Sequence, residues 1–312
     1  MPLAEVVAVA VTAGLIAVAF GLSFWVYHAR HDRSARVGLY LLLGLPGILL
    51  IVAGAAFLVG QQRDGLTFLL IGLSLTLPLV SPFRALVGRV IPLDPRSPVH
   101  MVGLSVVITA MVVFTISLIN IGTDVATLGT TEVSYIELIA QAVLLISLAY
   151  AAVGLWVARG FSEASARLGL RQPTFGTVGI AIGFVVLGFI VTGIGGVMTE
   201  IFQPGLTESI DEVMNESLGA FQNPIGALAI GISAGVGEEL LLRGALQPRF
   251  GIVLTSALFA LLHTQYGFSW TVVGLFGVGV LLGIERKRYG TTAAIITHAL
   301  YNTAAVLLSS MY

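Results

Sequence analysis

Six polar side chains lie in C-terminal stretches of the chain that are otherwise apolar enough to cross a membrane. They are Glu238, Glu239, Arg243, His263, His298 and Asn302. Burying an ionisable group in hydrocarbon costs about 2.5 to 3.5 kcal/mol on insertion scales, so such groups mark a functional site by default. We therefore predict a site that is built from three separate stretches.

The two adjacent glutamates are expected to have different tasks. On a helix they point about 100° apart, so they cannot face the same partner. Glu239 and Arg243 are four residues apart, in the order acid then base, which favours an ion pair on one helix face. Glu238 is then the carboxylate that remains for chemistry.

Two of the five histidines lie deep in the apolar stretches. At 1.5 Å per residue, Glu238, His263 and His298 lie roughly 10 to 18 Å from the cytoplasmic ends of their helices, which is a common level. Glu238 with His263 is predicted to hold a water that attacks a carbonyl carbon as the carboxylate takes its proton. His298 and Asn302 share a helix face and are predicted to donate hydrogen bonds as an oxyanion hole. The pattern predicts a water-activating hydrolase.

The composition predicts an all-α, polytopic transmembrane bundle. Hydrophobic residues make up 57% of the 312 residues and charged ones only 10%, and the mean hydropathy is +0.99. The net charge of -1 gives no basic field for nucleic acid, and the partners expected are the bilayer and a protein or peptide substrate. Without cysteine the chain has no disulfide, thiolate metal ligand or cysteine nucleophile.

Apolar runs of about 20 residues predict ten spans, with the active site within the last four. They lie at residues 4–27, 37–60, 66–88, 99–120, 136–158, 174–199, 224–247, 251–269, 270–285 and 291–311. All basic residues except Arg63 fall at alternate ends of these helices. By the positive-inside rule those ends are cytoplasmic, which predicts an integral protein of the cell membrane with both termini outside. The first run is too long for a cleavable signal peptide, so we expect it to be retained.

We expect three regions along the chain. Residues 1–199 are scaffold helices, residues 200–223 form a polar outer loop, and residues 224–312 carry the catalytic helices. The loop is acidic, and Ser209 followed by Glu212 has the spacing of a capping box. A short amphipathic helix on the outer surface is therefore predicted.

The three C-terminal strings resemble the CPBP (Abi) intramembrane protease family, which includes the type II CAAX prenyl endopeptidases. Its marks are a Glu-Glu-x-x-x-Arg helix, a Phe-x-x-x-His helix and a His-x-x-x-Asn helix. Here they stand as Glu238, Glu239 and Arg243, then Phe259 and His263, then His298 and Asn302. The resemblance covers roughly residues 224–308, and ten spans exceed the eight that are usual for CAAX-processing members.

The resemblance implies an intramembrane endopeptidase whose substrates are membrane-associated proteins, including prenylated CAAX proteins. Glu238 and His263 would activate water, His298 and Asn302 would stabilise the oxyanion, and Glu239, Arg243 and Phe259 would support them. We predict a metal-free glutamic mechanism without cofactor. The alternatives are a zinc protease that uses Glu238, His263 and His298, and a membrane transporter or scaffold without catalysis.

Overall fold

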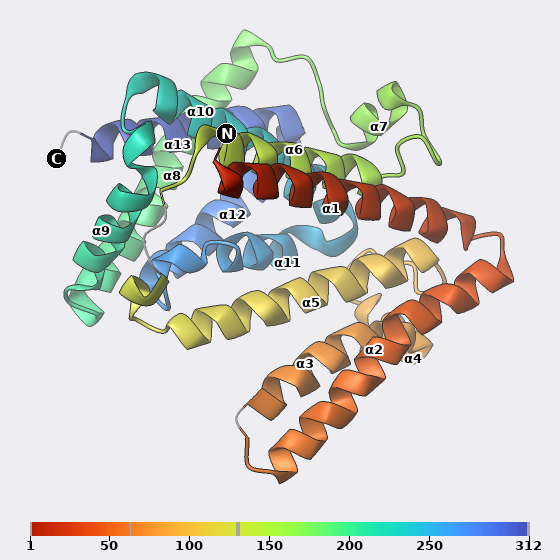
Figure 1. The fold of residues 1–312 in the computed structure, drawn as a ribbon. Coiled ribbons are helices and arrows are strands. Elements are labelled where there is room, and N and C mark those ends of the chain that lie inside the picture. Colours follow the sequence, from red (N-terminus) through yellow and green to blue (C-terminus); the bar gives the residue numbers. More distant parts are fainter. Residues whose placement is uncertain (1, 63, 129–131, 311–312) are drawn as a thin grey trace. The chain divides into compact units, whose positions relative to one another are not determined.

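The computed structural model describes residues 2–62, 64–128 and 132–310, and these form helices and no β-strand. The all-α, membrane-embedded fold class is confirmed. Figure 1 labels the helices. The α-helices are α1 (Leu3–His28), α2 (Arg33–Val59), α3 (Asp64–Thr76), α4 (Ser81–Val87), α5 (Pro98–Ile121), α6 (Tyr135–Ala152), α7 (Phe161–Arg167), α8 (Phe175–Phe202), α9 (Leu206–Leu218), α10 (Pro224–Glu239), α11 (Gln247–Leu261), α12 (Trp270–Tyr289) and α13 (Thr291–Ser309).

The number of spans differs from the ten that were predicted. Among the described residues, seven stretches are long and apolar enough to cross a membrane, or eight with one bent pair. Pro224–Leu261 counts as one stretch of 38 residues, although Gly251 interrupts its helical geometry with φ 78° and ψ 172°. The predicted boundary between the seventh and eighth helices falls at this break. α12 is not among the seven, and its last turns carry Glu285, Arg286, Lys287 and Arg288.

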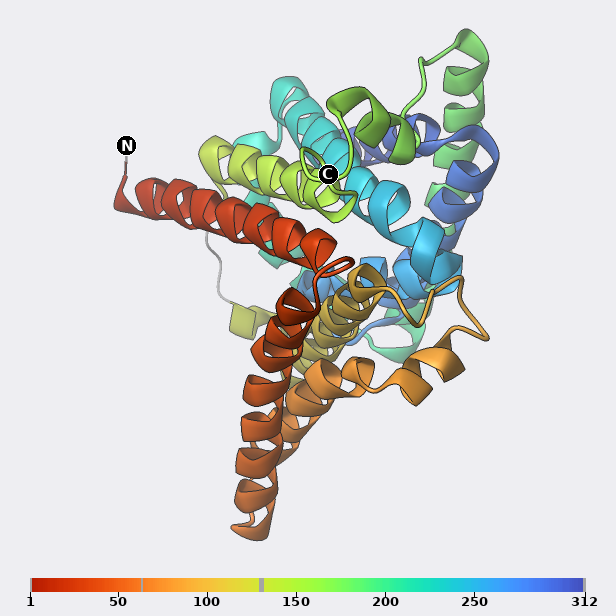
Figure 2. The ribbon, with the colours of Figure 1, turned by 90° about the vertical axis from the view of Figure 1, so that its right-hand side faces the viewer.

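The chain divides into two compact units, and residues 21–120 form one of them. Within this unit α2 and α3 lie side by side in both views of the ribbon (Figures 1 and 2). The stretch predicted as a single helix at 66–88 is broken: α3 and α4 meet at 88°. Pro78 and Pro82 lie at this bend, where each lacks the N–H that would continue a helix.

The other unit comprises residues up to 20 and from 121 onward, and it contains all the predicted site residues. In it α10 and α13 approach closely because α10 carries glycines on the facing side. A Cβ at Gly235 would lie 2.8 Å from the backbone nitrogen of Ala299 and 2.9 Å from the carbonyl oxygen of Ile295. Small residues let helix backbones meet at such short range in membrane proteins.

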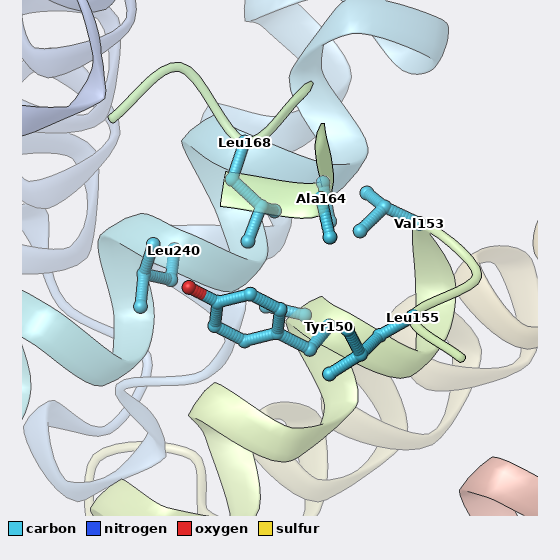
Figure 3. Close-up of a cluster of buried hydrophobic side chains, with 8 residues drawn as sticks. Tyr150, Val153, Leu155, Ala164, Leu168 and Leu240 are labelled. Atoms are coloured by element: carbon cyan, nitrogen blue, oxygen red, sulfur yellow. The ribbon is translucent and has the colours of Figure 1, made fainter. Parts of the chain in front are cut away.

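A buried apolar cluster supports the segment that follows α10. Tyr150, Val153, Leu155, Ala164, Leu168 and Leu240 gather there with Ala149 and Ala245 (Figure 3). The Tyr150 hydroxyl also lies 2.9 Å from the Ser165 hydroxyl. The predicted helix at 136–158 ends earlier, at Ala152, and the turns that follow supply Val153 and Leu155 to this cluster.

The amphipathic helix predicted in the loop is present as α9, with a different start and a different contact. It begins at Leu206 after Gly205, which has φ 82°. Ser209 lies inside the helix and donates to the Gly205 carbonyl instead of capping the helix. The apolar face packs on Val125 and Tyr266 of the same unit, so this face covers protein.

Candidate active site

Glu239 and Arg243 form the predicted ion pair. The Glu239 Oε2 to Arg243 Nε distance is 3.4 Å, and both side chains are fully buried. Arg243 lies in η4 (Leu240–Leu246), a π-helical segment that directly follows α10. Such segments occur inside α-helices and are frequent at functional sites. Arg243 also donates from Nη2 to the Gly279 carbonyl of α12 at 3.2 Å, which fixes the guanidinium between two helices.

His298 meets the same carboxylate from α13. Its Nδ1 lies 3.0 Å from Glu239 Oε1, and its side chain is 3% exposed. An ionised carboxylate only accepts, so Nδ1 carries the proton and Nε2 is the ring nitrogen left for a substrate or water. A neutral His298 therefore presents an acceptor at Nε2, and only the imidazolium presents a donor. The predicted role of His298 as an oxyanion donor therefore requires the protonated ring.

The Phe259 ring contacts three polar residues of the site, which are Arg243, His263 and His298. Its ring centroid lies 4.9 Å from the Arg243 guanidinium carbon, 4.7 Å from the His263 ring and 5.7 Å from the His298 ring. A guanidinium at this distance from an aromatic ring is attracted by its quadrupole. The ring thus contacts both imidazoles and the guanidinium.

His263 lies just beyond α11 and not on a helix as predicted. α11 ends at Leu261, and His263 has φ -97° and ψ 52°. Its Nδ1 lies 2.7 Å from the Phe259 carbonyl oxygen, one of the last carbonyls of the helix. Because a carbonyl only accepts, Nδ1 carries the proton here too. A neutral His263 then presents an unprotonated Nε2, which can accept a hydrogen bond from water.

The side chains of Glu238 and Asn302 have polar atoms without a hydrogen-bond partner among the described residues. Glu238 is half-buried on α10, and its Oε2 atom is buried without a hydrogen-bond partner among the described residues. Asn302 is half-buried on α13, one turn after His298, and its side chain has no hydrogen bond to the described part of the chain. A buried polar atom without a partner costs free energy, so it marks a place where a water or a ligand fits.

Two further polar groups were missed by the sequence analysis. Tyr266 follows His263 in the same loop, with ring centroids 6.3 Å apart. Burial, with smaller contributions from the charges of Tyr301, Asp211 and Glu238, raises the pKa of Tyr266 to about 12. Glu285 of α12 is fully buried and accepts from the Thr297 hydroxyl at 2.7 Å. Glu285 was missed because it stands next to a run of basic residues in the sequence, a pattern that is typical of a helix end.

The predicted zinc set does not come together. No three His, Asp or Glu side chains in the described ranges lie close enough to hold one metal ion. The Nδ1 atom of His298 faces Glu239, the Nδ1 atom of His263 faces a carbonyl, and the Phe259 ring contacts both imidazoles. In the described ranges Glu238, His263 and His298 do not form a group that could hold one metal ion.

The family comparison matches this part of the chain. Residues 220–304 match the Rce1-like model, described as type II CAAX prenyl endopeptidase Rce1-like. This segment is thus similar to the Rce1-like family. The match covers α10, η4, α11, α12 and most of α13, and it confirms the resemblance found in the three strings. Comparison with curated proteins and with solved structures gives no significant match.

Proposed function

We propose that this integral membrane protein is an intramembrane endopeptidase that hydrolyses peptide bonds of membrane-associated proteins by a metal-free, glutamate-based mechanism. The observation that carries the proposal is the contact between Glu239 and His298 in the Rce1-like segment. This contact orients the Nε2 atom of His298 on the helix face that also carries Asn302. The buried ion pair between Glu239 and Arg243 supports this arrangement.

The chemistry begins with a water between Glu238 and His263. Glu238 takes one proton of the water, His263 Nε2 accepts a hydrogen bond from the other, and the oxygen attacks the carbonyl carbon of the substrate. The carbonyl π bond opens and leaves a tetrahedral oxyanion. The proton held by Glu238 then passes to the leaving nitrogen as the C–N bond breaks. Water is consumed, and a carboxylic acid and an amine are released.

The oxyanion is proposed to lie between Asn302 and His298. The Asn302 carboxamide donates one hydrogen bond, and an imidazolium at His298 donates the second from Nε2. With two ionised glutamates, Glu238 and Glu239, and one guanidinium, a proton on His298 makes the site neutral overall. A buried cluster without net charge costs less to desolvate than one that carries a charge.

The substrate is proposed to be a protein or peptide held at the membrane, with CAAX-type prenylated proteins as one class. Cleavage near the cytoplasmic face of the cell membrane, with both termini outside, is proposed from the basic residues at alternate ends of the ten predicted stretches. This orientation requires an even number of spans, such as the eight that include the bent pair. The amphipathic helix α9 packs on Tyr266, next to the His263 loop.

The proposal is tested by comparing membranes that contain the wild-type chain with membranes that contain Glu238→Gln. Mass spectrometry should detect C-terminal fragments of membrane proteins only with the wild type. Glu216→Gln is the matched control because it removes the same charge from the exposed side of α9. Fragments that are equally abundant with wild type and Glu238→Gln would refute a protease that depends on Glu238.

A further inference from the structure

A polar cavity lies within the unit formed by residues 21–120, and none of the residues that line it belongs to the proposed protease site. Its volume is ≈ 300 Å³. Its polar lining consists of three arginines and three hydroxyl groups: Arg36, Arg84, Arg96, Tyr40, Ser81 and Ser97. None of the residues that line it is acidic. The cavity therefore has the composition of an anion site.

The charges in this cavity are not compensated. Among the described residues none of the three arginines forms an ion pair. Arg84 is only 5% exposed, and its guanidinium donates to neutral oxygens: the Pro78 carbonyl at 2.6 Å, the Pro95 carbonyl at 2.7 Å and the Tyr40 hydroxyl at 3.5 Å. A buried charge is normally paired, since an unpaired one is costly. The nearby Asp94 accepts the backbone N–H of Arg96 and forms no ion pair with the three arginines among the described residues.

The start of α5 adds to the positive potential. Ser97 and Pro98 line the cavity, and α5 begins at Pro98 and continues for 24 residues. The N-terminus of a helix carries a partial positive charge and attracts anions. Basic residues at cytoplasmic helix ends are common in membrane proteins. That rule accounts for exposed arginines such as Arg36 and Arg96, but not for the burial of Arg84 in the same cavity.

We propose that this cavity binds a phosphate group, with Arg36, Arg84 and Arg96 as the cationic ligands and the three hydroxyls as further hydrogen-bond partners. Guanidinium groups recognise phosphate oxygens through paired N–H donors. The cavity lies at the first turns of α2 and α5, where these apolar helices begin. Basic pockets between transmembrane helices on the cytoplasmic side of a membrane bind lipid head groups. A phospholipid head group and free phosphate share this chemistry.

The test measures binding to the purified full-length chain in neutral detergent. One arm titrates short-chain phosphatidylglycerol and follows the complex by native mass spectrometry. A second arm titrates inorganic phosphate and follows Tm. The variants are Arg36→Gln and Arg96→Gln, whose exposed side chains make loss of folding a small risk. The matched control is Arg89→Gln, an exposed arginine in the same unit that does not line the cavity.

Arg36→Gln and Arg96→Gln are each expected to weaken binding about tenfold, because each removes a charge-assisted hydrogen bond. Arg89→Gln is expected to bind as the wild type does. Binding of the lipid that phosphate does not displace would identify a head-group site. A Tm rise with inorganic phosphate alone would identify a free-phosphate site. Equal loss of binding in all three variants, or no binding in either arm, would overturn the proposal.

Discussion

Glu239 and His298 are 59 positions apart in the sequence and meet at 3.0 Å in the protein interior. The contact ties α10 to α13 and fixes which ring nitrogen of His298 faces the substrate side. The same carboxylate also pairs with Arg243, so one buried group holds two others in place. The predictions below follow from this arrangement.

Close packing of α10 on α13 is expected to be required for activity. Gly235→Ala would place a Cβ 2.8 Å from a backbone nitrogen of α13, which forces the helices apart and stretches the Glu239–His298 contact. A shift of about 1 Å in an active site can cost about 10²-fold in rate. Cleavage assays should show a loss of at least this order. Gly183→Ala on α8 is the control, since nothing lies within 4 Å of its Cβ; equal activity of the two variants would contradict this role of Gly235.

Removal of Arg243 is expected to lower stability strongly. Arg243→Met keeps the volume but leaves Glu239 buried without its ion pair, and breaking such a pair costs about 3 to 5 kcal/mol. Thermal unfolding in detergent measures the effect. The double variant Glu239→Gln with Arg243→Met should regain part of the loss because the buried carboxylate is removed and His298, which then has no acidic partner, can stay neutral. A Tm for Arg243→Met equal to that of Arg288→Met, at an exposed position, would show that the pair contributes nothing.

Loss of an oxyanion donor is expected to affect turnover and not substrate binding. Asn302→Ala removes a carboxamide that has no hydrogen bond to the described part of the chain, so the fold should be unaffected. One such donor is worth about 10² to 10³ in kcat. Steady-state kinetics should show a drop in kcat of this order at nearly constant KM. An increase in KM with unchanged kcat would assign Asn302 to substrate binding instead.

Chelators are expected to leave cleavage unchanged. The three side chains of the zinc alternative, Glu238, His263 and His298, do not form a metal-binding group. The measurement is the initial rate before and after treatment with a zinc chelator and after removal of the chelator. Inactivation that added zinc reverses would replace the metal-free mechanism by the zinc alternative.

The sequence predicted contacts between residues that are close together in the chain. It did not predict contacts that depend on how the helices pack. The Glu239–Arg243 pair follows from four-residue spacing, and apolar length places most helices within a few residues. The Glu239–His298 contact depends on how closely α10 and α13 approach, which is decided by glycines such as Gly235. No spacing rule predicts that approach.

Local geometry that departs from a regular helix was also missed. The π-helical segment η4 and the position of His263 in a loop both arise where tertiary contacts override a continuous apolar pattern. Helical periodicity extends through such places unchanged, so the pattern predicted helix at 251–269 where α11 ends at Leu261. The predicted start of α9 was wrong for a related reason. Gly205, with a positive φ, precedes the first residue of the helix, and the spacing of Ser209 and Glu212 only resembles that of a capping box.

The most direct test of the central claim is a comparison of substrate binding and turnover in purified Glu238→Gln. The glutamine keeps the shape of the side chain but cannot take a proton from water, so kcat should fall by about 10² to 10⁴-fold. The substrate Kd and the Tm should stay close to those of the wild type. A kcat within a few-fold of the wild-type value would contradict the role of Glu238 as the base that activates water.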